Sequence, residues 1–188
     1  MTQVQSERVF HRANKNEWPH ITHGEGLYLV DSDGRRYLDA CAGVHVVSIG
    51  HGVEEIADAM SAQARKLSFT YSRFLTQPQI DLAEKITAST PEGLARVFFV
   101  SGGSEATESA MKMARKYHIE TGNPQKHRVI TRWQSWHGNT VGALSMSGRS
   151  PWRQDYEPYL LNFPHISPPY NYRCAYCQDQ PTCQLDCA

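Results

Sequence analysis

A short turn rich in glycine and serine carries the residues of this sequence best suited to hold an anion. Ser101-Gly102-Gly103-Ser104 lies between an apolar run, residues 97–100, and a helical pattern that starts at Glu105. Backbone N–H groups in such a turn and the dipole of the following helix favour a phosphate, and Gly103 has no side chain to block its approach. A plain strand-to-helix turn has the same shape, so the turn alone leaves both interpretations open.

A second motif, Trp136-His137-Gly138, follows another strand-like segment at residues 127–131. Because parallel strands end at the same edge of a sheet, we expect this motif to reach the edge that carries the turn at residues 101–104. An aromatic ring there can stack on a flat ligand, and the glycine lets the backbone come close. Trp136 can equally be a buried aromatic and Gly138 a turn residue, but the two motifs together favour a phosphorylated aromatic cofactor.

The pattern around these motifs predicts a strand, a helix and a second strand. Residues 97–100 form an apolar run typical of a buried strand, and residues 127–131 are predicted as the next strand. The helix between them has one apolar face, made by Ala106, Ala110, Met113, Ala114 and Tyr117. This alternation predicts an α/β fold with a parallel sheet and right-handed crossovers.

The flanking segments are less regular. Residues 26–39 are predicted as a hairpin around Asp33-Gly34, and two amphipathic helices are predicted at residues 53–67 and 78–87. Residues 41–52 are punctuated by glycine and apolar, which predicts a buried loop or short strand. Residues 147–188 are predicted to be mostly loop, and we expect a further element of the fold beyond Ala188.

The overall composition excludes several classes of partner. The 19 basic and 19 acidic side chains cancel, so no net charge recruits nucleic acid or an anionic membrane. The sequence contains no run of membrane-spanning length and no apolar signal-peptide region, so we expect a soluble cytoplasmic protein.

Four cysteines lie close together near residue 188, in the pattern C-x2-C-x5-C-x3-C. They are Cys174, Cys177, Cys183 and Cys187. Such a cluster can hold zinc or form disulfides, but the second half lacks the usual C-x2-C spacing. We therefore expect reduced cysteines in a loop and no metal site.

The motifs in combination resemble those of the class III (ω-type) aminotransferases. These enzymes use pyridoxal phosphate on the type I fold of the aspartate aminotransferase superfamily. The matching residues of the central segment are Ser101 to Ala106, Glu108, Ala110, Lys112, Ala114, Arg115 and Trp136-His137-Gly138. The hairpin at residues 26–39, Gly50-His51 and Glu54-Glu55-Ile56 match the same family in order and spacing. The resemblance covers nearly the whole chain.

The resemblance implies an incomplete type I fold, an α/β structure built on the mostly parallel sheet of the large domain. Residues 1–50 would form an N-terminal segment of the small domain and a dimer-facing arm. Residues 51–188 would form the first part of the large cofactor-binding domain. Because the family builds its active site between two subunits, a homodimer is also implied.

The resemblance also assigns cofactor-binding residues. Gly103 and Ser104 would hold the phosphate through backbone N–H groups and the Ser104 hydroxyl. Trp136 would stack on the pyridine ring, where the family usually has tyrosine or phenylalanine. His137 would lie beside the cofactor, and Gly138 completes the motif.

Four other residues match segments that shape the substrate pocket of the family, often from the partner subunit. They are Val44, His45, Tyr71 and Phe74. The family often has a bulky aromatic residue where His45 stands, so the size and polarity of the substrate do not transfer. His45 and His51 can also be histidines whose hydrogen bonds are satisfied by the backbone.

The chemistry of the family needs two more groups. A lysine forms the Schiff base and moves the proton, and an aspartate keeps the pyridinium nitrogen protonated. None of the six lysines follows a strand in the required region; they are Lys15, Lys66, Lys85, Lys112, Lys116 and Lys126. We therefore assign no catalytic residue in this chain and expect the lysine and the aspartate beyond Ala188.

The leading functional hypothesis is the N-terminal portion of an aminotransferase that moves an amino group from an amine or amino acid to a 2-oxo acid. The 188 residues alone would be inactive. A second hypothesis is a non-catalytic fragment or one subunit of a split enzyme. A third is a serine hydrolase, because residues 102–106 form a G-x-S-x-A variant of the nucleophile elbow with Ser104 as the nucleophile.

Overall fold

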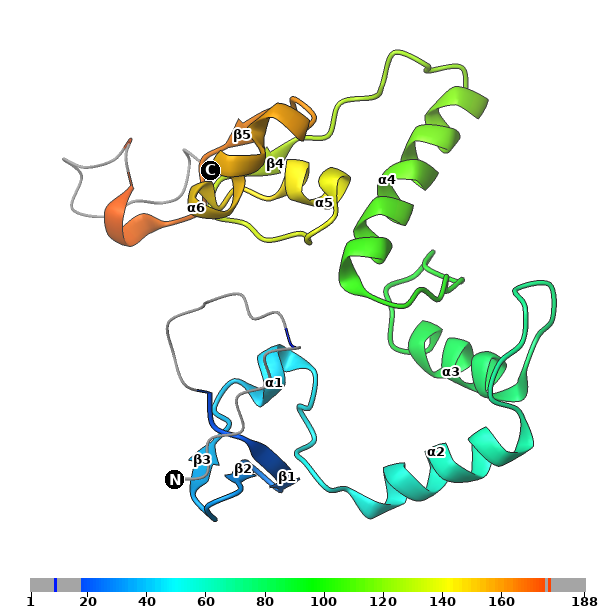
Figure 1. Ribbon diagram of the computed structural model, residues 1–188. Helices are drawn as coiled ribbons and strands as arrows, with labels where there is room; N and C mark the ends of the chain where they lie inside the picture. The colour runs from blue at the N-terminus through cyan, green and yellow to red at the C-terminus, as the bar shows by residue number, and fades with distance from the viewer. Residues whose placement is uncertain (1–8, 10–17, 175, 177–188) are drawn as a thin grey trace. The chain divides into compact units, whose positions relative to one another are not determined.

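A computed structural model describes residue 9, residues 18–174 and residue 176 of the 188-residue chain. The chain divides into two compact units, Met1–Asp81 and Leu82–Ala188. The domain boundary at residue 50 that the sequence suggests stays a prediction. Figure 1 shows the elements of both units.

The first unit contains a three-stranded antiparallel sheet in the order β1-β2-β3. The strands are β1 (Ile21–Glu25), β2 (Tyr28–Asp31) and β3 (Arg36–Leu38). β2 and β3 form the predicted hairpin, and Gly34 at its turn has a φ of 78°. The carboxylate of Asp31 accepts hydrogen bonds from the backbone N–H of Arg35 (2.8 Å) and the hydroxyl of Tyr37 (2.8 Å). These bonds close the turn and lower the pKa of Asp31, although its burial opposes that shift. β1 was not predicted from the sequence.

The segment after β3 differs from the prediction of a buried loop or short strand. Residues Ala42–His45 form a single helical turn, α1, and all four have φ between 47° and 66°. This is the left-handed conformation, which costs an L-residue other than glycine about 1 kcal/mol or more. Most of residues 41–50 are exposed, with Val44 76% exposed. The turn is therefore an exposed, strained feature.

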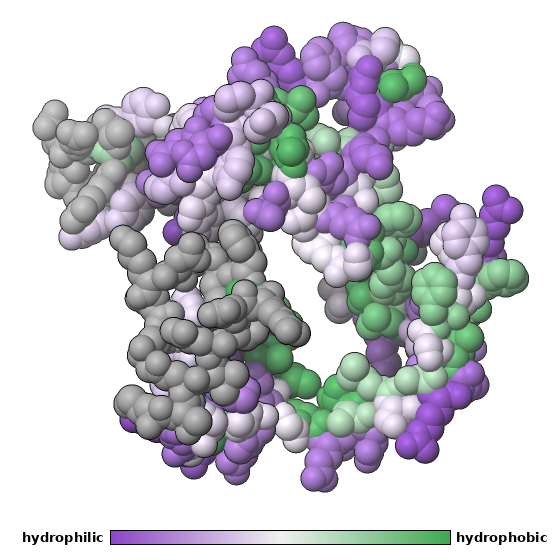
Figure 2. Space-filling view, in the orientation of Figure 1, coloured by the Kyte–Doolittle hydropathy of each residue, from purple (hydrophilic) through white to green (hydrophobic). Residues whose placement is uncertain are grey.

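Two helices follow close to their predicted positions, α2 at Glu54–Lys66 and α3 at Gln77–Thr87. Their apolar faces are not covered within the described part of the chain: no side chain of either helix is buried, and the same holds for α4. Ile56, Met60 and Leu82 are examples of exposed apolar side chains. Apolar side chains accordingly reach the surface in Figure 2. None of the described helices combines the length and apolar character needed to cross a membrane.

The second unit is built on a long helix, α4, and a small layer of short elements. α4 spans Gly103–Glu120. The short elements are β4 (Thr131–Arg132), α5 (Val141–Met146), α6 (Ser150–Arg153), the 3-10 helices η1 (Gln154–Tyr159) and η2 (Asn171–Arg173), and β5 (His165–Ile166). β4 and β5 pair in parallel (Figure 1). The unit is thus mixed α/β.

The core of the second unit lies around α5. Ala143, Leu144 and Met146 are buried, and the buried guanidinium of Arg153 satisfies the end of the helix. Its Nη1 donates to the carbonyl oxygens of Leu144 (3.0 Å), Ser145 (3.0 Å) and Ser147 (2.7 Å). Since the last carbonyls of a helix have no partner within it, Arg153 acts as its C-terminal cap.

Two predicted strands are not formed as expected. Residues 97–100 adopt no regular structure, and only Thr131 of residues 127–131 lies in a strand. A strand requires backbone hydrogen bonds to a neighbour, and no described strand pairs with residues 97–100. Residues 147–188 were predicted as mostly loop, yet they contain α6, β5 and two 3-10 helices.

Of the four clustered cysteines, Cys174 is half-buried at the end of η2, while Cys177, Cys183 and Cys187 lie outside the described residues. Within the described residues, no three side chains of the metal-ligating types histidine, cysteine, aspartate or glutamate come together. The predicted state of the cysteines stays a prediction.

Candidate active site at the N-terminus of α4

The N-terminus of α4 is open to a ligand. Gly102 is the extended N-cap residue, and the helix begins at Gly103. The first N–H groups of a helix have no partner within it, and the helix dipole places partial positive charge there. A Cβ atom added to Gly102 or Gly103 would meet nothing within 4 Å. An anion can therefore approach this backbone closely.

Glu105 fixes the turn that leads into the helix. Its Oε2 accepts a hydrogen bond from the backbone N–H of Ser101 (2.8 Å) and another from the Ser101 hydroxyl. The hydroxyl bond is the main cause that lowers the pKa of Glu105. This arrangement is related to a capping box, in which a first-turn glutamate reaches back to the preceding backbone.

Ser104 joins α4 to the loop that carries the second motif. The backbone N–H of Asn139 donates to Ser104 Oγ at 2.9 Å, and the hydroxyl of Thr107 donates to the carbonyl oxygen of His137 at 2.9 Å. Gly138 lies between these contacts with φ of 140°, and a Cβ there would fall 2.4 Å from Ser104 Oγ. Only glycine fits this close approach. Because Ser104 Oγ accepts from Asn139, its own hydrogen is left to donate elsewhere.

One turn further along α4, Glu108 binds the N-terminus of α5. Its Oε1 accepts from the backbone N–H groups of Gly142 (3.0 Å) and Ala143 (3.4 Å). The pKa of Glu108 is lowered, chiefly by a side-chain hydrogen bond from Thr140 and further by the two backbone bonds. A carboxylate at the N-terminus of a helix is electrostatically favoured. Glu108 therefore fixes α4 relative to the loop that precedes α5.

Trp136 and His137 stand at the start of this loop. The indole of Trp136 packs edge-on against Trp152, with ring centroids 4.7 Å apart and an angle of 85° between the planes, and it is 47% exposed. His137 has an exposed side chain, and its backbone N–H donates to Ser147 Oγ at 2.9 Å. The backbone of this loop is thus held by α4 on one side and by the buried end of α5 on the other.

The residues predicted for the substrate pocket lie in the first unit. Val44 and His45 are on the left-handed turn α1, and both are exposed. Tyr71 and Phe74 form a turn in which the Phe74 N–H donates to the carbonyl of Tyr71 at 3.0 Å, and their side chains are 60% and 65% exposed. Their role in a pocket stays a prediction.

The amino-acid sequence of the chain is similar to those of known proteins. The family profile described as aminotransferase class-III matches residues 9–187. The chain belongs to this family. It is 40% identical over 154 residues to the putrescine–pyruvate aminotransferase of Pseudomonas aeruginosa, and this match covers 81% of this chain and 34% of that protein. It is 36% identical over 177 residues to the adenosylmethionine-8-amino-7-oxononanoate aminotransferase of Methanocaldococcus jannaschii, and this match covers 89% of this chain and 38% of that protein.

Solved structures of class III enzymes superpose on this chain. The crystal structure of the Methanocaldococcus jannaschii enzyme gives a TM-score of 0.82 at 34% identity and covers 87% of this chain and 39% of that one. The ω-transaminase of Pseudomonas jessenii, solved in complex with PMP, gives a TM-score of 0.83 at 30% identity. The match covers 89% of this chain and 39% of that one. The predicted type I fold is thereby confirmed, in part of its extent. The chain spans about a third of the length of the curated relatives that it matches.

For a class III aminotransferase, the residues at α4 fit a phosphorylated cofactor. The first turn offers unpaired backbone N–H groups, Ser104 offers a hydroxyl hydrogen, and Gly103 leaves open space in front of them. The exposed indole of Trp136 offers an aromatic surface in the loop that contacts this turn. The residues predicted from the sequence therefore include two segments that the structure brings together, Gly103-Ser104 and His137-Gly138.

Thr107 and Asn139 were not predicted as site residues, and Glu108 was noted only as a match to the family, without its contact to α5. Thr107 and Glu108 bind groups at least 30 residues away, and periodicity within one helix cannot reveal such contacts. A carboxylate on the helix that follows the turn, together with the small-residue helix start at Gly142, is the signal that could have suggested the Glu108 contact.

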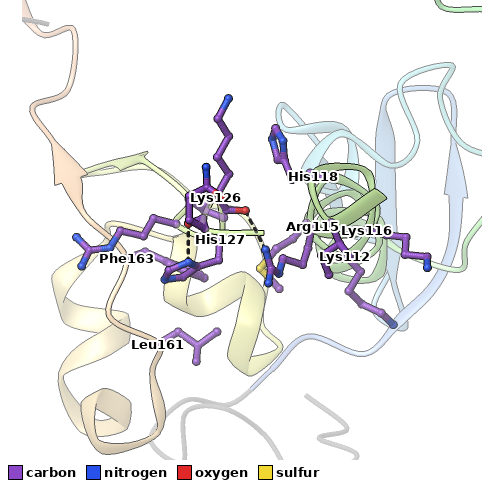
Figure 3. A pocket seen from close by; sticks show the side chains of 14 residues that line it. Lys112, Arg115, Lys116, His118, Lys126, His127, Leu161 and Phe163 are labelled. Atoms are coloured by element: carbon purple, nitrogen blue, oxygen red, sulfur yellow. Dashed lines mark hydrogen bonds between the residues drawn. The ribbon is translucent and has the colours of Figure 1, made fainter. Parts of the chain in front are cut away.

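The C-terminal half of α4 borders a separate cavity of about 1000 Å³. Figure 3 shows that its walls come from α4, the loop at residues 125–129 and the side chains of Leu161 and Phe163. Arg115 crosses one side and donates to the carbonyl oxygens of Pro124 and Lys126, the latter at 3.3 Å. Arg115 thereby holds the loop against the helix. Ser104 does not line this cavity, so it is distinct from the candidate active site.

Proposed function

We propose that this chain supplies the phosphate-holding part of the active site of a pyridoxal-phosphate-dependent aminotransferase. The reaction moves an amino group from an amine or amino acid to a 2-oxo acid. The observation that carries the proposal is the contact of Ser104 with residues 138 and 139 at the open N-terminus of α4. Membership of the class III family supports the assignment of the cofactor.

When bound, pyridoxal phosphate supplies the electron sink that this chemistry needs. The N–H groups of Gly103 and Ser104 would bind the phosphate, and the Ser104 hydroxyl would donate to it. Trp136 would stack on the ring, with His137 beside it. The proton-transferring lysine and the pyridinium aspartate are expected outside these residues, since Lys112 and Lys116 lie along α4, away from its first turn.

The experiment uses the protein that carries this chain, purified after addition of pyridoxal phosphate. We expect a visible absorption band from the bound cofactor, loss of that band on adding an amino donor, and formation of alanine from pyruvate. Failure to bind the cofactor would refute the proposal. Gel filtration with light scattering tests the proposed homodimer, and cell fractionation tests the proposed cytoplasmic location.

The split-enzyme hypothesis has its own test. Residues 1–188 mixed with a separately produced downstream segment would transaminate if two polypeptides complete the site. The hydrolase hypothesis has less support, because the described contact to Ser104 Oγ comes from a backbone N–H and not from a histidine ring. A fluorophosphonate probe that labelled Ser104 would revive it.

A further inference from the structure

The side chains of Asp39 and His51 form a hydrogen-bonded pair that contacts the left-handed turn α1 through Asp39. His51 Nε2 lies 2.9 Å from Asp39 Oδ2, and the two side chains are 19% and 8% exposed. Both side chains are therefore largely covered. The pair joins the two ends of the segment that runs from β3 to α2.

Asp39 holds the start of the turn. Its Oδ2 also accepts the backbone N–H of Gly43 at 2.8 Å, and its carbonyl oxygen accepts the N–H of Ala42 at 3.0 Å. The thiol of Cys41 donates to Oδ1 at 3.5 Å. The Gly43 bond and the His51 bond are the two main causes that lower the pKa of Asp39. The Asp39 carboxylate is therefore hydrogen-bonded directly to Gly43, a residue of the turn with positive φ.

His51 is itself fixed to the sheet. Its backbone exchanges two hydrogen bonds with Gly26, at 3.0 Å and 2.7 Å. Its side chain packs so closely on Gly24 that a Cβ there would fall 2.5 Å from His51 Cβ. His51 is therefore held against the sheet, and the Asp39 carboxylate links it to the turn by hydrogen bonds to both.

A turn of three residues other than glycine in the left-handed conformation does not persist without such support. Strained backbone of this kind is concentrated at active sites and ligand-binding segments. The turn presents Val44 and His45 at the surface, and these are two of the predicted substrate-pocket residues.

We propose that Asp39 and His51 are positioning residues that hold the turn Ala42–His45, and with it Val44 and His45, in the orientation that receives the amino substrate. This inference rests on the proposed aminotransferase function. The pair does not touch the reacting atoms in this proposal; it acts through the turn.

The test compares His51→Leu with His51→Gln. Leucine keeps the packing on Gly24 but removes the ring nitrogen, whereas the side-chain amide of glutamine can still donate to Asp39. Asp39→Ala removes the other partner. His20→Leu and Asp33→Ala, at exposed positions of the same unit, are the matched controls.

Hydrogen exchange of residues 42–47 is measured by mass spectrometry, because the N–H groups of His45 and Val46 are hydrogen-bonded within the turn. We expect exchange at least tenfold faster in His51→Leu and Asp39→Ala, and near wild-type exchange in His51→Gln and both controls. Unchanged exchange in His51→Leu would overturn the inference.

The second measurement is steady-state transamination of pyruvate with propylamine and with 1-phenylethylamine. We expect KM for the accepted amine to rise at least fivefold in His51→Leu, with kcat within twofold and recovery in His51→Gln. Faster exchange without a change in KM would also overturn the inference. A wild-type protein that binds no cofactor and transaminates neither amine refutes the proposed function instead, and the exchange result still decides whether the pair holds the turn.

Discussion

Gly138 lies so close to Ser104 that the two residues leave no room for a methyl group between them. A Cβ on residue 138 would fall 2.4 Å from Ser104 Oγ and 2.8 Å from Ser104 Cα. The Trp136-His137-Gly138 motif is therefore in direct contact with the glycine- and serine-rich turn at residues 101–104. This contact and the hydrogen bonds of Glu108 to α5 hold the start of α4 and the loop at residues 136–140 together.

Gly138→Ala is expected to destabilise the protein by about 2 kcal/mol or more, because the methyl group collides with backbone and residue 138 has a φ of 140°. Affinity for pyridoxal phosphate should fall as the loop moves away from Ser104. Urea unfolding and a cofactor titration measure the two effects. Gly122→Ala is the control: its φ is also positive, at 75°, but an added Cβ would meet nothing within 4 Å. Equal losses in the two variants would argue against the close approach.

Ser104→Ala should weaken binding of pyridoxal phosphate about tenfold. The substitution removes the hydroxyl donor to the phosphate and leaves the N–H of Asn139 without its acceptor. Equilibrium titration followed by absorbance gives the dissociation constant. Ser109→Ala, on the same helix, should bind like the wild type. A Ser104→Ala protein with unchanged affinity would mean that the hydroxyl does not contact the phosphate.

Glu108→Gln should lower the free energy of unfolding by about 1 kcal/mol at neutral pH, because the amide binds the N-terminus of α5 less strongly than a carboxylate does. The pKa of Glu108 in the folded protein is below its ordinary value of 4.5. Its stabilising effect is therefore fully present above pH 4.5 and is lost as the pH falls through the folded pKa.

The measurement for Glu108 is urea unfolding of both proteins from pH 7 down to pH 3. The stability difference between wild type and Glu108→Gln should shrink across the acidic part of this range. Glu84→Gln, at an exposed position on α3, should show little difference at any pH. A difference that stayed constant down to pH 3 would contradict the role of the carboxylate charge.

The helices and the β2–β3 hairpin were largely predictable from the sequence, whereas the strands expected on either side of α4 were not. α2, α3 and α4 follow from the spacing of apolar residues along one segment. Residues 97–100 have the composition of a strand, but a strand depends on a partner that local sequence does not specify. The left-handed turn α1 could not be predicted, since Ala42, Val44 and His45 do not favour positive φ.

The candidate site shows the same limit. Gly103, Ser104 and the Trp136-His137-Gly138 motif could be found because their residue types match a recognisable pattern. The structural roles of Thr107 and Glu108 could not be predicted, because they depend on contacts with residues 137 and 142. The sequence thus indicated the groups proposed to bind the cofactor, but it did not indicate the contacts that hold their segments together.

Arg153→Met should be the most destabilising of these substitutions, by about 3 kcal/mol. The guanidinium is buried and donates to three carbonyl oxygens at the end of α5, and methionine would leave them without that donor. Thermal unfolding should show a clear drop in Tm, while Arg96→Met, at an exposed position, should change Tm little. Because Ser147 Oγ accepts the backbone N–H of His137, loosening the end of α5 should also displace the loop at residues 136–139. Cofactor affinity should therefore fall in Arg153→Met at temperatures where the protein is still folded, and an unchanged affinity there would show that the loop is held by α4 alone.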